Sequence, residues 1–149
     1  MADKRHENRE NAFTLLFAKE FDRETDPAEF YQAYLDNNNV QFADYVKNTF
    51  LGVCEQCDTI DRTIEEVSVK WKLSRMATVT RTVLRLAVYE MTCSEVPVKV
   101  VINEAIEIAK KYDDENSTGF VNGILNKIAR NRGLIDPVPA AESVKQDEE

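Results

Sequence analysis

The sequence predicts an all-α protein of about seven helices, and three observations support that fold class. Glycine and proline, the residues that most often interrupt helices, number only four each in 149 residues. Apolar residues recur at spacings of three and four, the period of a helix with one buried face, and no stretch shows the sustained alternation of a strand. The chain is long enough to bury one sizeable core. We therefore expect a single helical domain over residues 1–134.

Four helices are expected in the first half of the chain. Residues 4–21 carry the first apolar face. Pro27 opens a second helix, residues 27–35, because its missing N–H costs nothing in a first turn. Residues 40–57 and 60–69 repeat the apolar spacing, so each is predicted to pack one face against a core.

Three helices are expected in the second half. The clearest is residues 76–91, whose apolar positions follow the i, i+3, i+4, i+7 pattern closely, so we expect it at the centre of the fold. Pro97 opens the next helix, which has a wide apolar face. The last is predicted to begin at Asn116 or Ser117, either of which can accept a backbone N–H bond as a cap, and Gly133 is placed to end it.

The last segment of the chain, residues 135–149, differs in composition from the rest. It contains two prolines, no apolar periodicity and a net negative charge, so it is predicted to be an acidic, disordered tail. No apolar run approaches the ~18 residues needed to cross a bilayer, and the first residues do not resemble a signal peptide. We therefore expect a cytoplasmic protein with no membrane contact.

Charge is unevenly distributed along the chain. The formal net charge is −8, which by itself argues against binding to nucleic acid. Residues 24–69 contribute −8, whereas residues 70–135 hold eleven basic against seven acidic residues, a net charge of +4. One side of the folded molecule is therefore expected to be basic, and a polyanion would bind on that side.

Residues suited to catalysis or metal binding are scarce. His6 is the single histidine, and it is predicted in a mobile terminal turn, where it cannot supply a catalytic triad or a metal site with several histidine ligands. Cys54 and Cys57 have the C-x-x-C spacing of redox and zinc sites, but no second pair completes four zinc ligands. Both are predicted near a helix C-terminus, where the thiol pKa is not lowered, so we expect them to be packing residues. The sequence predicts no enzyme activity, metal ion or cofactor.

Phe120 lies off the apolar stripe of the last predicted helix, close to the start of that helix. A helix start offers free N–H groups to a phosphate, Gly119 allows close backbone approach, and Asn116, Ser117 and Thr118 can bond bases or sugars. An aromatic side chain there can stack on an unpaired base. The alternative interpretation, a core phenylalanine, is equally compatible with the residue chemistry.

The start of the chain offers a second group of candidate nucleic-acid contacts. Lys4, Arg5 and Arg9 lie within two turns of the first predicted helix, and Arg5 and Arg9 are four apart, on one face. They are predicted either to contact phosphates or to form a solvated helix start with charged neighbours.

Three segments have a distinctive order and spacing: VLRLAVYEM at residues 83–91, VPVKVVINEAIEIAKKY at 96–112 and STGFVNGILNKIA at 117–129. Together they resemble the NusB family of bacterial transcription antitermination factors. The resemblance implies two small packed helical bundles. It also implies binding to boxA-type single-stranded RNA together with a small ribosomal-subunit protein acting as NusE. The pair would join an RNA polymerase complex that reads ribosomal RNA operons past termination signals.

The resemblance also implies positions for the binding residues. The RNA contacts fall on Lys4, Arg5, His6 and Arg9 at the start of the chain and on Asn116, Ser117 and Phe120, of which Phe120 is the base-stacking residue. The partner contacts fall on Phe17, Phe21 and Thr80. Phe17 and Phe21 are four apart, so burial of both against the second helix is the alternative.

Two other functions remain compatible with the residues. A helical scaffold that binds only protein is favoured by the acidic total and the thin basic start. A thiol redox enzyme built on Cys54 and Cys57 would require an abnormally low thiol pKa.

Overall fold

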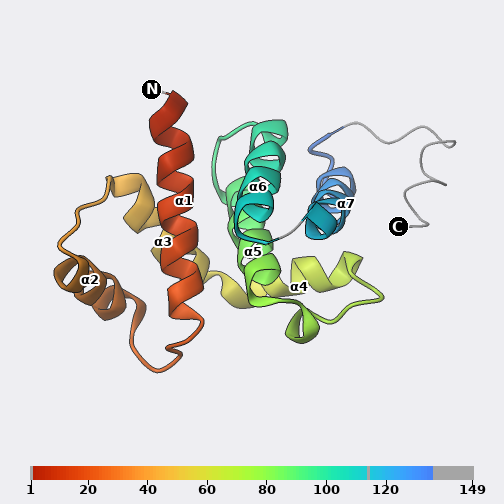
Figure 1. Ribbon diagram of the computed structural model, residues 1–149. Helices are drawn as coiled ribbons and strands as arrows, with labels where there is room; N and C mark the ends of the chain where they lie inside the picture. The colour runs from red at the N-terminus through yellow and green to blue at the C-terminus, as the bar shows by residue number, and fades with distance from the viewer. Residues whose placement is uncertain (1, 114, 136–149) are drawn as a thin grey trace, which may run out of the picture.

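The structure is a computed structural model that describes residues 2–113 and 115–135, and it is all-helical over them (Figure 1). This confirms the predicted fold class. The elements are α1 (Ala2–Lys19), α2 (Pro27–Asn38), α3 (Asp44–Glu55), α4 (Cys57–Val67), the short 3₁₀ helix η1 (Leu73–Arg75), α5 (Thr78–Cys93), α6 (Val98–Tyr112) and α7 (Glu115–Asn131).

The helices form two groups that share one hydrophobic core. Helices α1, α2 and α3 lie together on one side, and α4 to α7 form the other group (Figure 1). Helix α5 packs against α1, α3, α4, α6 and α7, which confirms its predicted central position. Its buried residues occur along nearly its whole length, as expected for a helix covered on several sides.

Helix boundaries differ from the prediction at two places that matter for the functional residues. Helix α3 ends at Glu55 and α4 begins at Cys57, so Cys57 lies at a helix start and not near a C-terminus. Helix α7 begins at Glu115, so Asn116 and Ser117 belong to its first turn and the predicted capping position is wrong. Helix η1 was not predicted, because a three-residue helix has no apolar period of its own.

The end of α7 agrees with the sequence prediction. Gly133 has a φ of +69°, a left-handed conformation that glycine adopts without a side-chain clash. The amide of Leu134 then donates to the carbonyl of Ala129 at 2.8 Å, which satisfies a carbonyl left open at the helix end. The tail was predicted over residues 135–149, and all of it after Ile135 lies outside the residues that the structure describes. None of the described helices is long and apolar enough to cross a membrane.

Candidate nucleic-acid interface

The first two turns of α7 form one wall of a shallow groove of about 350 Å³. The groove is lined by Trp71, Met76, Ala77, Thr80, Asp113, Asn116, Ser117 and Phe120. The structure therefore brings together the three α7 residues predicted to contact RNA. Phe120 is half-buried and packs in part against the core, so both of the interpretations suggested by its sequence position apply to part of its surface.

Thr80, predicted as a partner contact, lines this same groove. It is buried, and its hydroxyl donates a hydrogen bond to the Asp113 carboxylate at 3.1 Å. This bond joins the start of α5 to the residue that follows α6, and so shapes the groove beside Phe120.

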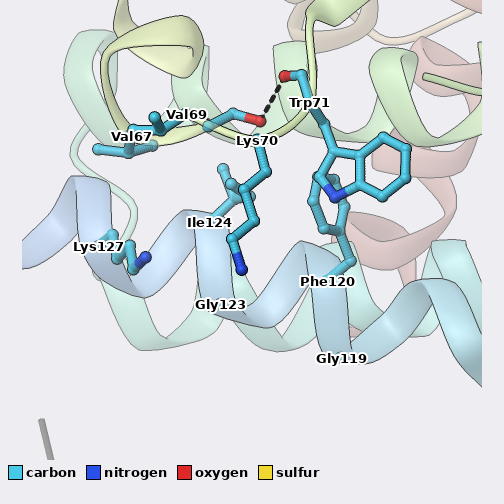
Figure 2. Close-up of a pocket in the computed structure, with 10 residues that line it drawn as sticks. Val67, Val69, Lys70, Trp71, Gly119, Phe120, Gly123, Ile124 and Lys127 are labelled. Atoms are coloured by element: carbon cyan, nitrogen blue, oxygen red, sulfur yellow. Dashed lines mark hydrogen bonds between the residues drawn. The ribbon is translucent and has the colours of Figure 1, made fainter. Parts of the chain in front are cut away.

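A second groove meets the first at Phe120 and Trp71 and lies between α7 and the segment that follows α4 (Figure 2). Its volume is about 130 Å³. It is lined by Val67, Ser68, Val69, Lys70, Trp71, Gly119, Phe120, Gly123, Ile124 and Lys127. Trp71 is 56% exposed, unusual for so large an apolar side chain.

Trp71 and its lysine neighbours were missed by the sequence analysis. The signal was present, because Trp71 is the only tryptophan and lies between Lys70 and Lys72 in a short stretch between helices. Basic residues interleaved with an aromatic one are typical of single-strand binding surfaces. A pattern of helical periodicity does not identify such a stretch, because the stretch lies between helices.

The basic start of α1 lies apart from these grooves. Lys4 and Arg5 are exposed, whereas the Nδ1 atom of His6 lies 2.7 Å from a carboxylate oxygen of Glu104 on α6. Helix α6 packs between α1 and α7 (Figure 1). The two groups of predicted RNA contacts therefore lie on opposite flanks of α6, and an RNA touching both would have to pass over it.

Arg9 differs from the other predicted phosphate contacts because it is buried. Its side chain is 3% exposed, and its Nε atom donates to both carboxylate oxygens of Glu90, which is 2% exposed, at 3.0 Å. Its Nη1 atom donates to Glu104 at 3.3 Å, and the hydroxyl of Tyr45 donates to Glu90. Burial raises the pKa of Glu90 despite these partners. Arg9 thus joins α1 to α5 and α6 and presents no free guanidinium to a phosphate.

The predicted partner contacts on α1 belong to a line of four aromatic rings. Phe13 lies between Tyr112 and Phe17, at centroid distances of 5.0 and 6.0 Å, and Phe17 meets Phe21 edge-on at 5.3 Å. Phe17 is half-buried against the core, whereas Phe21 is 72% exposed. The line therefore runs from the exposed Tyr112 through the buried Phe13 to the exposed Phe21, and it offers an apolar edge at the end of α1.

Charged residues hold the end of α1 in place beside this edge. Glu20 accepts hydrogen bonds from Arg81 at 2.8 Å and from Arg85 at 3.0 Å, and Arg85 also forms a two-bond pair with Asp61. Burial raises the pKa of Glu20, but the hydrogen bond from Arg81 and the charges of Arg85 and Arg81 outweigh it, so the pKa is lowered overall.

The two cysteines of the C-x-x-C pair have the opposite electrostatics from a redox site. Burial raises the pKa of Cys54 to about 11. Cys57 starts α4, where the helix dipole favours a thiolate, yet burial and then the nearby carboxylate of Asp61 raise its pKa despite the charge of Arg85. A redox pair needs a thiolate at neutral pH, so this arrangement argues against thiol chemistry.

Comparison with known proteins gives a consistent result. The profile of the NusB family matches residues 6–130. The chain is 39% identical over 132 residues to the transcription antitermination protein NusB of Clostridium perfringens, covering 85% of this chain and 97% of that protein. A higher identity, 62% over 78 residues, is found with NusB of an Anaeromyxobacter species, but that match covers 52% of this chain and 54% of the relative, so it spans about half the length of either protein.

Solved structures agree with the sequence matches. The structure of T. maritima NusB superposes with a TM-score of 0.75 at 40% identity, covering 85% of this chain and 90% of that one. A NusB chain solved with NusE and double-stranded RNA has the same TM-score at 28% identity, covering 88% and 99%. The profile match, the match along nearly the whole Clostridium perfringens protein and the superposition on solved NusB structures lead to one conclusion: the chain belongs to the NusB family.

Proposed function

We propose that this protein is a non-catalytic RNA-binding adaptor that, with a NusE-type ribosomal protein, binds boxA-type RNA and supports antitermination on ribosomal RNA operons. The observation that carries the proposal is the position of Phe120 in a NusB-family chain. Its ring lies where two surface grooves meet, and their lining includes Asn116, Ser117, Lys70 and Lys127. The carboxylate in this lining, Asp113, accepts a hydrogen bond from Thr80. An aromatic side chain that is only partly buried can stack on an unpaired base, worth ~1 to 3 kcal/mol.

The remaining RNA contacts follow from exposure. Asn116 and Ser117 line the groove beside Phe120 and are proposed to bond the RNA backbone or base edges. Lys4 and Arg5 are exposed and are proposed to contact phosphates, with His6 beside them. The buried Arg9 is proposed to act through its ion pairs, by holding this part of α1 against α5 and α6.

The partner surface is proposed at the end of α1. A relative of this chain has been solved with NusE and double-stranded RNA, which supports a ribosomal-protein partner here. Phe21 and the accessible part of Phe17 supply the apolar anchors of this surface. Thr80 is buried, so its role is proposed to be indirect, through the hydrogen bond that holds Asp113 in place. The assembly would act in the cytoplasm, as part of the antitermination complex of RNA polymerase.

A titration of a short boxA-type RNA, with and without the ribosomal-protein partner, tests the proposal. We expect the partner to raise affinity markedly, because two exposed cations at the start of α1 form a thin basic patch that a basic partner would extend. We expect Phe120→Ala to weaken RNA binding by ~1 to 3 kcal/mol with the salt dependence nearly unchanged.

Arg5→Ala serves as the control. The loss of a phosphate contact should weaken binding to all sequences about equally and make the salt dependence less steep, by about 0.7 in the logarithmic slope per phosphate on a single strand. Equal affinity with and without the partner would remove the adaptor mechanism. A Phe120→Ala protein that melts early but whose folded fraction binds RNA normally would identify Phe120 as a core residue only.

A further inference from the structure

We infer that the groove between α7 and residues 67–71 is a second nucleotide subsite, in which Trp71 stacks on a base next to the one on Phe120. This inference rests on the proposed RNA-binding function and extends it to a surface on the far side of Phe120. Figure 2 shows Trp71 and Phe120 at one end of the groove, with Lys70 reaching from the loop toward α7 and Lys127 at the other end.

The charge of the groove favours an anionic occupant. Lys70 and Lys127 are the two charged residues of its described lining, and both are cationic. The chain as a whole carries a net charge of −8, whereas the described lining of this groove holds two lysines and no carboxylate. Lysines beside aromatic rings match the alternating phosphates and bases of a single strand.

The shape of the groove is set by glycine. Gly119 and Gly123 are one helical turn apart on α7 and both line the groove. A Cβ atom built on either would meet nothing within 4 Å. The missing side chains therefore leave open the space that a base would occupy, with Ile124 contributing an apolar wall.

The loop that carries Trp71 is held in place before any ligand binds. The hydroxyl of Ser68, which is buried, donates to the carbonyl of Trp71 at 2.7 Å (Figure 2). On the other side, Arg81 donates to the carbonyls of Leu73 and Met76 at 3.2 Å each. An exposed tryptophan on a fixed loop is a surface for stacking that needs little rearrangement.

The test is a titration of a boxA-type RNA extended by a few uridines at either end, with the ribosomal-protein partner present. We expect Trp71→Ala to weaken binding roughly 5- to 150-fold, the loss of one base stack, and Trp71→Phe to retain most of the affinity. Gly123→Leu should fold, because leucine favours a helix over glycine, but should block the groove and weaken binding similarly.

The lysines are tested by salt dependence. Lys70→Ala and Lys127→Ala should each reduce the salt slope by about 0.7, whereas Lys47→Ala, which removes an exposed lysine of α3 in the other group of helices, should leave it unchanged. Because Trp71 is the only tryptophan of the chain, its fluorescence in the chain alone should be quenched by the extended RNA.

The outcomes separate this inference from the proposed function. If Trp71→Ala and Gly123→Leu bind the extended RNA as tightly as the unmodified chain while Phe120→Ala binds it weakly, the second subsite is wrong and the proposed function stands. If the Trp71→Ala protein no longer binds the ribosomal-protein partner but binds RNA as tightly as the unmodified chain, the groove binds protein and the inference is overturned. If the unmodified chain binds no RNA with or without the partner, both are wrong.

Discussion

Arg5 and Arg9 lie one helical turn apart on α1, yet their environments are opposite. Arg5 is exposed, whereas Arg9 is enclosed with Glu90 and Glu104. The difference arises because the two partners of Arg9 come from α5 and α6, 81 and 95 residues away in the chain. Residue type and local spacing therefore do not distinguish a ligand contact from a cation that holds helices together.

Arg9→Met tests this distinction. The substitution keeps an unbranched side chain but leaves the buried Glu90 without its cation, which should lower the free energy of unfolding by about 3 to 5 kcal/mol at neutral pH. Because burial already raises the pKa of Glu90, the carboxyl can take up a proton, and the deficit should shrink as the pH is lowered. Urea unfolding at several pH values measures this.

Arg5→Met is the matched control, expected to change stability by less than ~0.5 kcal/mol because the residue is exposed. If Arg9→Met keeps full stability but loses RNA affinity, Arg9 contacts RNA directly and the positional role argued for it is wrong.

Phe21 provides the clean test of the partner surface. It is 72% exposed, so Phe21→Ser should change the free energy of unfolding by no more than ~0.5 kcal/mol while weakening binding of the ribosomal-protein partner. Phe17→Asp is less informative, because Phe17 is half-buried and packs against Phe13 as well. Val100→Ser, which removes an apolar side chain 40% exposed on α6, is the control. Equal partner affinity for the Phe21→Ser protein and the unmodified chain would move the partner surface elsewhere.

At the scale of helices, two glycines in helix interiors have opposite surroundings. A Cβ atom on Gly52 of α3 would overlap the ring end of Tyr89 on α5, whereas one on Gly123 of α7 would meet nothing. Gly52 thus allows α3 and α5 to approach closely, while Gly123 leaves a surface open. A glycine in a helix therefore marks a close helix contact at Gly52 and an open groove at Gly123.

The same substitution should have opposite effects at these two positions. Gly52→Ala is expected to lower the free energy of unfolding by ~1 to 3 kcal/mol, because Tyr89 must move out of its packed position. Gly123→Ala is expected to raise it by ~0.5 to 1 kcal/mol, since alanine restricts the unfolded chain and favours the helix. Denaturant unfolding of both proteins measures the pair. A stabilised Gly52→Ala protein would show that Tyr89 has room to swing aside.

The fold was largely predictable at the level of helices and much less so at the level of the site. Periodicity identified α5 and Gly133 identified the end of α7, because both signals are local in the chain. The junction between α3 and α4 was predicted too late, between residues 57 and 60, because the apolar pattern continues across Gln56, where one helix ends at Glu55 and the next starts at Cys57. Burial of Arg9 and exposure of Trp71 depend on contacts between distant segments, which no local pattern contains.

At the scale of the whole molecule, the two helical groups are joined by charge as well as by the core. Glu20 at the end of α1 bonds Arg81 and Arg85 of α5, and Arg85 continues to Asp61 of α4. These residues are half-buried, so their interactions are less screened than those of surface pairs. The cluster crosses the boundary between the two groups of helices.

Acid should weaken this connection. The pKa of Glu20 is lower in the folded protein than its ordinary value of 4.5, so its contribution to stability is present above that value and is lost as pH falls through the folded pKa. We expect thermal stability to decline below about pH 4.5. Glu20→Gln should be less stable near neutral pH and should lose less on acidification. Parallel acid profiles for the two proteins would show that other carboxylates control the decline.

The ion pairs along α1 also have a consequence for entropy. Arg9, His6 and Glu10 attach the first turns of this helix to α5 and α6, through Glu90, Glu104 and Lys111. Helix ends without such attachments fray, and a basic arm that is unstructured must lose conformational freedom when it binds. Here Lys4 and Arg5 project from a helix that is already ordered. The association of RNA with them should therefore proceed without a coupled folding step, and its heat-capacity change should reflect buried surface alone.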